Sequence, residues 1–154
     1  MLFRSARPIQ NMSAAEDLPP FYTLAPVIPG TIEAFQRLAE LPVKLAVVSG
    51  DTTPNIEKFL GYNYLLPFVD GVRGADVYPR KPDPECFWQM CAALGVKPEA
   101  TVMIGDATGD MAMARSAGAA AGIGVLWGWS LAHGIDQADG IVERWEQLRF
   151  MAQD

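Results

Sequence analysis

The chain has 154 residues, of which 50% are hydrophobic and 19% are charged. This composition is typical of a folded globular domain, and it excludes a disordered chain, which would contain fewer apolar and more charged residues. No apolar run approaches the roughly 18 residues that a membrane-spanning helix needs, and we therefore expect no membrane partner. The length suits one domain with a substantial buried core.

The formal net charge is −6. A negative chain lacks the general electrostatic surface that binds nucleic acid, and it is compatible with binding metal cations. Cys86 and Cys91 lie in one predicted helix, where we expect two reduced thiols in the core. Residues 1–10 contain no long apolar stretch of the kind found in secretory signals, so we expect a cytoplasmic location.

Residues 1–29 differ from the rest of the chain because they are rich in proline and show no sustained periodicity. They are predicted to form an irregular linker, followed by a folded domain over residues 30–154.

From residue 30 onward, helical and strand patterns alternate. Apolar residues at three- and four-residue spacing predict helices, and short β-branched runs predict buried parallel strands. The alternation predicts an α/β fold with a mainly parallel sheet, in which ligands bind at the carboxyl ends of the strands. The strands are expected, in chain order, over 43–48, weakly around Gly71 and Val72, over 101–104, over 123–126, and briefly at Ile141 and Val142. The helices are expected from Ile32 to about Pro42, from the N-cap Thr53 to a stop at Gly61, and from Asp83 and Pro84 to about Leu94. Two more are expected over 110–117, closed by Gly118, and from about Trp145.

Polar residues follow two of the predicted strands. Ser49 comes after the first strand, Asp106 follows the strand over 101–104, and Asp110 comes four residues later. Lys81 lies in the loop before the next helix and could reach the same edge. A hydroxyl and an ammonium group bind phosphate oxygens, and carboxylates hold a hard cation such as Mg²⁺. The pattern therefore predicts a site for phosphate and a metal ion.

Each of these residues also has a structural interpretation. Ser49 is compatible with a simple turn before Gly50, and Lys81 with a solvated lysine. Asp110 is favourable at the positive end of a helix. Asp106 is harder to explain by structure alone, because a carboxylate directly after a strand lies where ligands bind. The order and spacing of the four residues favour a site.

Two further pairs of residues lie near this edge. Trp127 and Trp129 flank Gly128 after the strand over 123–126, where they either line a substrate entrance or pack in the core. Arg73 and Asp76 are expected to form an ion pair at the surface.

Three segments resemble motifs two, three and four of the haloacid dehalogenase superfamily, with the closest similarity to its phosphoglycolate phosphatase-like hydrolases. They are Val-Val-Ser-Gly at 47–50, Arg-Lys-Pro-Asp-Pro at 80–84 and Val-Met-Ile-Gly-Asp-Ala-Thr-Gly-Asp at 102–110. The resemblance covers roughly residues 26–150, and its motifs occur in the family's order on the expected elements. It implies a Rossmann-like, three-layer core with a parallel sheet.

The resemblance also implies an enzyme, a Mg²⁺-dependent phosphatase that acts on a small phosphorylated metabolite. In the family an aspartate attacks the phosphoryl group, and water then hydrolyses the aspartyl-phosphate. Carried over by position, Ser49 and Gly50 bind the phosphoryl group, Lys81 stabilises its charge, and Asp106 ligates Mg²⁺. Asp110 ligates the metal or orients its water and Lys81. Ser49, Lys81 and Asp106 are thus the implied catalytic residues.

The family's first motif, Asp-x-Asp-Gly-Thr, carries the nucleophile, and this sequence contains no Asp-x-Asp. The cap that normally follows that motif is absent too. In the family, the strand that bears this motif lies between the strands ending at Ser49 and Asp106. We therefore expect an incomplete core over 30–154, preceded by a linker or truncated cap exit over 1–29, and a fragment with little activity alone. Unpaired strand edges would favour self-association.

Two other functions stay open at this point. A non-catalytic remnant of the family would keep the phosphate and metal site without a nucleophile. A receiver-like signalling domain uses the same residue types on a parallel sheet, but there the acidic pair comes first. Here Ser49 comes first and the acidic pair last, which disfavours a receiver.

Overall fold

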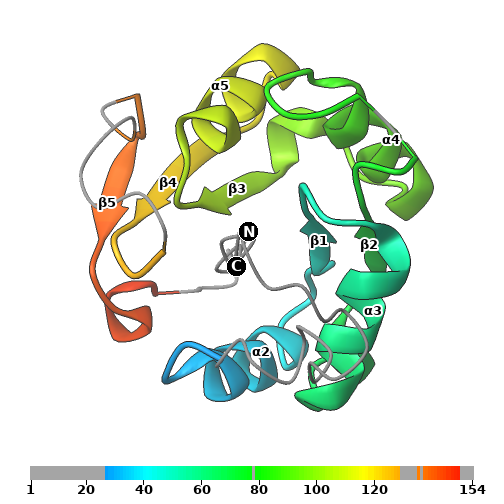
Figure 1. Cartoon of the computed structure of the whole chain (residues 1–154). Helices are drawn as coiled ribbons and strands as arrows, with labels where there is room; N and C mark the ends of the chain where they lie inside the picture. The colour runs from blue at the N-terminus through cyan, green and yellow to red at the C-terminus, as the bar shows by residue number, and fades with distance from the viewer. Residues whose placement is uncertain (1–26, 78, 129–134, 136, 150–154) are drawn as a thin grey trace, which may run out of the picture.

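The computed structural model describes residues 27–77, 79–128, 135 and 137–149. In these residues helices and strands alternate, and every strand pairing is parallel, which confirms the predicted α/β class (Figure 1). The strands are β1 (Ala46–Val48), β2 (Gly71–Arg73), β3 (Val102–Gly105), β4 (Ala121–Val125) and β5 (Gly140–Val142), and the α-helices are α2 (Thr31–Ala39), α3 (Thr53–Tyr62), α4 (Glu85–Leu94) and α5 (Thr108–Ala117).

The described strands form two parallel sheets. β1 pairs with β2, and the second sheet has the order β3-β4-β5. Among the described strands, none pairs with the remaining edge of β1 or of β3. Figure 1 shows these two as the inner strands of the two sheets. The break between the sheets therefore falls where the resemblance places the missing central strand.

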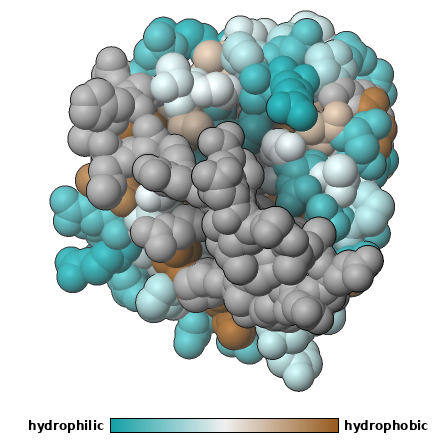
Figure 2. Space-filling model, viewed as in Figure 1, coloured by the Kyte–Doolittle hydropathy of each residue, from teal (hydrophilic) through white to brown (hydrophobic). Residues whose placement is uncertain are grey.

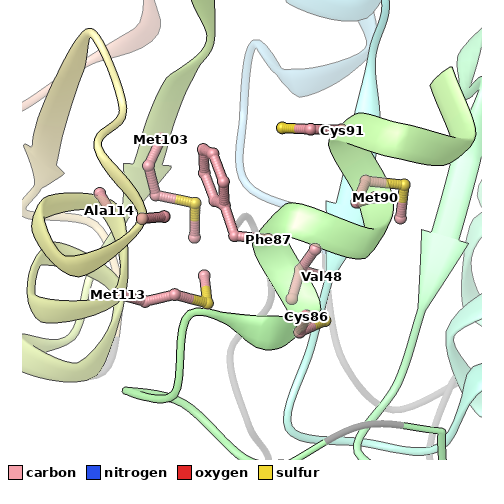
Figure 3. Close-up of a cluster of buried hydrophobic side chains, with 9 residues drawn as sticks. Val48, Cys86, Phe87, Met90, Cys91, Met103, Met113 and Ala114 are labelled. Carbon is pink, nitrogen blue, oxygen red and sulfur yellow. The ribbon is translucent and has the colours of Figure 1, made fainter. Parts of the chain in front are cut away.

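Helix α4 joins the two sheets through a shared hydrophobic cluster. Figure 3 shows Phe87 of α4 between Met103 of β3 and Val48 of β1. Because one helix packs against both inner strands, their relative position is set without direct pairing between them. The buried members of this cluster are Val48, Cys86, Phe87, Met90, Cys91, Met103, Met113, Ala114 and Ala117.

A second cluster lies on the opposite face of β1 and β2, under α2 and α3. Val47 belongs to this cluster, whereas its neighbour Val48 belongs to the first, as expected for side chains that alternate along a strand. The fold thus has helices on both faces of the β1–β2 sheet. The buried members of the second cluster are Phe35, Val47, Ile56, Leu60, Leu65 and Val72.

The first strand is shorter than the sequence predicts. It was expected from Val43, but its pairing begins at Ala46. The Leu45 amide instead donates to the Asp70 carboxylate at 2.9 Å. A side chain therefore satisfies the backbone donor that would otherwise extend the ladder.

Helix α3 also differs from the prediction at both ends. Thr52, not Thr53, is the N-cap, and Gly61 does not stop the helix, which continues one residue further. The side-chain amide of Asn63 donates to the Phe59 carbonyl at 2.9 Å. The backbone amide of Asn63 donates to the same carbonyl at 3.1 Å, so Asn63 caps the last turn in place of a glycine.

The last predicted helix is, within the described residues, only a short 3₁₀ turn over Trp145–Gln147. Its geometry is fixed locally, because the side-chain oxygen of Gln147 accepts the amides of Glu143 at 2.6 Å and Arg144 at 3.1 Å. The Gln147 side chain thus closes the turn, and the first residue of the turn is the buried Trp145.

Hydrophilic side chains cover most of the described surface in the view of Figure 2, and hydrophobic ones are scattered among them. No helix in the described part of the chain is both long and apolar enough to cross a bilayer. Most of the predicted linker, residues 1–26, lies outside the described residues, as does Trp129.

Candidate phosphate and metal site

The turn between β3 and α5 carries two buried carboxylates. Asp106 follows β3 and is 7% exposed, and Asp110 lies in the first turn of α5 and is fully buried. The helix begins at Thr108, earlier than the sequence predicts, because the Asp110 carboxylate accepts the Ala107 amide at 3.2 Å. Asp110 thereby satisfies one of the free donors at the helix start.

Lys81 forms an ion pair with Asp110 at this turn. Its ammonium lies 2.5 Å from Oδ1 of Asp110, and the two side chains are 16% and 1% exposed. Both oxygens of Asp110 are thus engaged, Oδ1 by Lys81 and Oδ2 by the Ala107 amide. Taking two charges out of water is costly, so such a pair is weak evidence for stability and better evidence for a functional site.

Two glycines make room for these carboxylates. A Cβ on Gly105 would lie 2.4 Å from Cβ of Asp110, and a Cβ on Gly128 would lie 2.0 Å from Oδ2 of Asp106. The backbone therefore passes directly against both side chains, and the turn after β4 closes on Asp106. Gly105 belongs to the Gly-Asp motif, whereas no sequence signal links Gly128 to Asp106.

Ser49 lies directly after β1 and is 9% exposed. Its amide donates to the Arg73 carbonyl at 3.0 Å, and its hydroxyl accepts the Asp51 amide at 3.2 Å. A hydroxyl that accepts still has its own hydrogen to donate. A Cβ on the neighbouring Gly50 would meet nothing within 4 Å, so its backbone is open. Phosphate binding by Ser49 and Gly50 stays a prediction.

Asp76 has a structural role that the sequence did not indicate. Its Oδ1 accepts the amide of Thr53 at 2.7 Å and the hydroxyl of Thr53 at 3.0 Å, and that hydroxyl accepts the Gly74 amide at 2.9 Å. The backbone hydrogen bond from Thr53 lowers the pKa of Asp76. The expected pair of Arg73 with Asp76 is not among the ion pairs of the described residues, and Arg73 donates to the Val72 carbonyl at 2.7 Å.

The two cysteines are free and buried in the cluster under α4, as expected for reduced thiols that fill a core. Burial raises the pKa of the Cys86 thiol, while the nearby charges of Lys81 and Arg73 oppose that shift. A buried thiol with a raised pKa is a poor nucleophile and a poor metal ligand. The cysteines therefore belong to the core and not to the site.

Trp127 packs against another indole. Its ring centroid lies 5.0 Å from that of Trp145, and the Trp145 indole nitrogen donates to the Thr31 hydroxyl at 3.0 Å. These contacts favour the core alternative for Trp127 over an open substrate entrance. Trp145 and Thr31 are 114 residues apart along the chain, so no local sequence pattern could reveal their hydrogen bond.

The carboxylates of this site fit a magnesium ion. Among the described residues, no group of three or more His, Cys, Asp or Glu side chains comes together, which excludes a closed zinc site there. Mg²⁺ instead needs one or two carboxylates together with water and phosphate oxygens. Asp106, directly after β3, would hold the ion, and Asp110 beside it accepts hydrogen bonds from Lys81 and the Ala107 amide.

Comparison with known proteins gives the same family. The sequence profile described as "Hydrolase: haloacid dehalogenase-like hydrolase" matches residues 11–118. A phosphatase of Dickeya dadantii named IndB is 37% identical over 66% of this chain and 44% of its own length. The phosphoglycolate phosphatase of Caulobacter vibrioides is 36% identical over 58% of this chain and 38% of its own. The crystal structure of a phosphatase of this family from Thermococcus onnurineus superposes with a TM-score of 0.73 at 26% identity, over 82% of this chain and 58% of that one.

The fold, the ordered motifs and these matches define the class of protein: the chain belongs to the haloacid dehalogenase-like hydrolase family. It spans less than half the length of the two curated relatives, at 44% and 38%.

Proposed function

We propose that this protein is a Mg²⁺-dependent phosphomonoester hydrolase for small phosphorylated metabolites, and that this chain supplies its phosphate- and metal-binding residues from a core over residues 30–154. The main support is the buried pair of Lys81 and Asp110 beside Asp106 at the carboxyl end of β3. Membership of a hydrolase family and similarity to proteins named as phosphatases support the reaction class.

The residues divide the work of holding a phosphoryl group. Mg²⁺, when bound, would neutralise charge on the phosphoryl oxygens, and the Asp106 carboxylate would hold it. Lys81 would place its ammonium against the same oxygens, with Asp110 fixing its position through the ion pair. Ser49 would donate its hydroxyl hydrogen to a further oxygen. In this arrangement Asp110 is a positioning residue.

The proposed reaction runs through an aspartyl-phosphate. An aspartate oxygen attacks phosphorus, the ester bond breaks, and the alcohol leaves; water then releases phosphate and restores the aspartate. No Asp-x-Asp occurs in the sequence, so we assign the attacking aspartate to no residue of this chain. The chain alone is therefore expected to bind Mg²⁺ and phosphate without rapid turnover.

The test is a calorimetric titration of Mg²⁺ into the full chain, with and without inorganic phosphate, followed by an assay with p-nitrophenyl phosphate. We expect Asp106→Asn to abolish Mg²⁺ binding and the matched variant Asp70→Asn, far from the site in a surface pair with Lys44, to leave it unchanged. Equal Mg²⁺ binding by wild type and Asp106→Asn would overturn the site. Robust Mg²⁺-dependent turnover by this chain would overturn the assignment of the nucleophile.

A non-catalytic phosphate- and metal-binding protein is the second candidate, and the absence of Asp-x-Asp favours it. It predicts the same binding and no turnover under any condition. Turnover by this chain, alone or after mixing with a separate polypeptide that carries the family's first motif, would exclude it.

A further inference from the structure

The turn that follows β4 lies directly on a carboxylate of the site. A Cβ at Gly128 would come within 2.0 Å of Oδ2 and 2.2 Å of Cβ of Asp106. Asp106 therefore cannot move toward this turn, and its position depends on where Trp127 and Gly128 are held.

The turn is held in place by a pair of indoles. Trp127 precedes Gly128, and its ring lies 5.0 Å from the ring of Trp145 at an angle of 36°. Trp145 is 1% exposed and lies in the short 3₁₀ turn over Trp145–Gln147.

The second indole is itself fixed by the start of α2. The Trp145 indole nitrogen donates to the hydroxyl of Thr31, the first residue of that helix, at 3.0 Å, and both residues are buried. The neighbouring Gly30, with φ of 84°, approaches the same ring closely: a Cβ there would lie 3.2 Å from it. The ring is thus confined by a hydrogen bond and by the backbone.

We propose that Thr31, Trp145 and Trp127 form a positioning device, here called the indole latch, that holds the Gly128 turn against Asp106 and so sets the carboxylate for Mg²⁺. The inference rests on the proposed function for the metal, and its residues touch neither metal nor phosphate. The latch connects the turn at Asp106, through the half-buried Trp127, to the buried Trp145 and Thr31.

Matched variants test the latch in the full chain. Thr31→Val keeps the shape of the side chain and removes the acceptor for Trp145, whereas Thr101→Val removes a similar hydroxyl that bonds the Lys97 carbonyl elsewhere. We expect Thr31→Val to weaken Mg²⁺ binding about tenfold, within the range found for residues that orient metal ligands, and Thr101→Val to leave it unchanged.

A second matched pair removes an indole. Trp127→Phe is compared with Trp88→Phe, because Trp88 lies half-exposed on α4, where its N–H donates to the Ala117 carbonyl at 3.1 Å. Weakened Mg²⁺ binding in Trp127→Phe alone supports the latch. Equal affinities in Trp127→Phe and Trp88→Phe, at equal folding, overturn it.

A metal-free measurement separates failure of the latch from failure of the proposed function. Gly128→Ala pushes a Cβ into Asp106, and this should cost less once Thr31→Val has released the turn. We expect the double variant to shift the unfolding midpoint by less than the sum of the single variants. Additive shifts overturn the latch, even if wild type binds Mg²⁺. A combined shift smaller than the sum supports it, even if Mg²⁺ binding proves absent, and a combined shift larger than the sum overturns it.

Discussion

Aspartates on the two sides of the sheet break are stabilised in different ways. On the β3 side, Asp110 is 1% exposed and paired with the ammonium of Lys81. On the β1–β2 side, Asp70 and Asp76 are exposed and accept backbone amides, which lower the pKa of each carboxyl group. The first arrangement removes charge from water, whereas the second fixes a loop at little desolvation cost.

The difference indicates that the fold carries a desolvation cost on the β3 side and little on the β1–β2 side. A buried ion pair gives little net stability over an apolar pair of the same size, so its presence at the carboxyl end of a strand favours binding chemistry. The exposed aspartates need no such explanation, because each satisfies a backbone donor next to the strand or helix that it borders.

The largest expected effect comes from breaking the buried pair. Asp110→Asn removes the charge that pairs with Lys81 in this part-buried site, and we expect a loss of about 3 kcal/mol in the free energy of unfolding. Asp70→Asn breaks the exposed pair with Lys44 and should cost less than about 1 kcal/mol. Denaturant unfolding in metal-free buffer measures both. Similar losses in the two variants would remove the distinction between the two sides.

Substitution of one glycine on each side of the sheet break is expected to change the free energy of unfolding by a smaller amount. Gly105→Ala forces a Cβ to 2.4 Å from Asp110, and we expect about 1–3 kcal/mol of destabilisation from overpacking. Gly61→Ala places a Cβ in open space on α3, where it should stabilise the helix by about 0.5–1 kcal/mol. Thermal unfolding distinguishes the signs. A neutral Gly105→Ala would show that the Asp110 turn shifts easily.

A smaller effect concerns acid stability on the β1–β2 side. Because the folded-state pKa of Asp76 lies below its ordinary value, its contribution is complete above that value and is lost as pH falls through the lower, folded-state pKa. Between about pH 5 and pH 2, wild type should therefore lose stability more steeply than Asp76→Asn. Glu57→Gln, on the exposed surface of α3, is the matched charge control. Parallel pH profiles for wild type and Asp76→Asn would contradict the assigned hydrogen bond.

The order of elements and the Gly-Asp turn could be predicted because they depend on local patterns. Alternating helix and strand periods, the closing Gly118 and the acidic turn after β3 are all visible within a few residues. The positions of Ser49 and Asp106 after strands likewise follow from the sequence.

Contacts between distant segments could not be predicted. The Trp145–Thr31 bond and the approach of Gly128 to Asp106 depend on tertiary packing that leaves no periodic signal. The start of β1 was misplaced for the same reason, because the Asp70 side chain that takes the Leu45 amide comes from another part of the chain. Local patterns thus predict the elements, and side chains from elsewhere determine where they end.

The last prediction, with the smallest expected effect, concerns whether the β1–β2 side and the β3 side unfold together. Cys86 and Cys91 are 4% and 3% exposed within the cluster that joins the sheets under α4, and burial raises the pKa of the Cys86 thiol. The low exposure slows reaction of both thiols with a disulfide reagent, and the smaller thiolate fraction slows that of Cys86 further. If α4 holds both sheets throughout, the thiols should react at pH 8 only as fast as the chain unfolds globally, and fully in denaturant. Single Cys→Ser variants assign each rate to one thiol.

Reaction of either thiol faster than global unfolding would show that the β1–β2 side opens separately from the β3 side. The two sides would then differ in dynamics as well as in how their aspartates are stabilised.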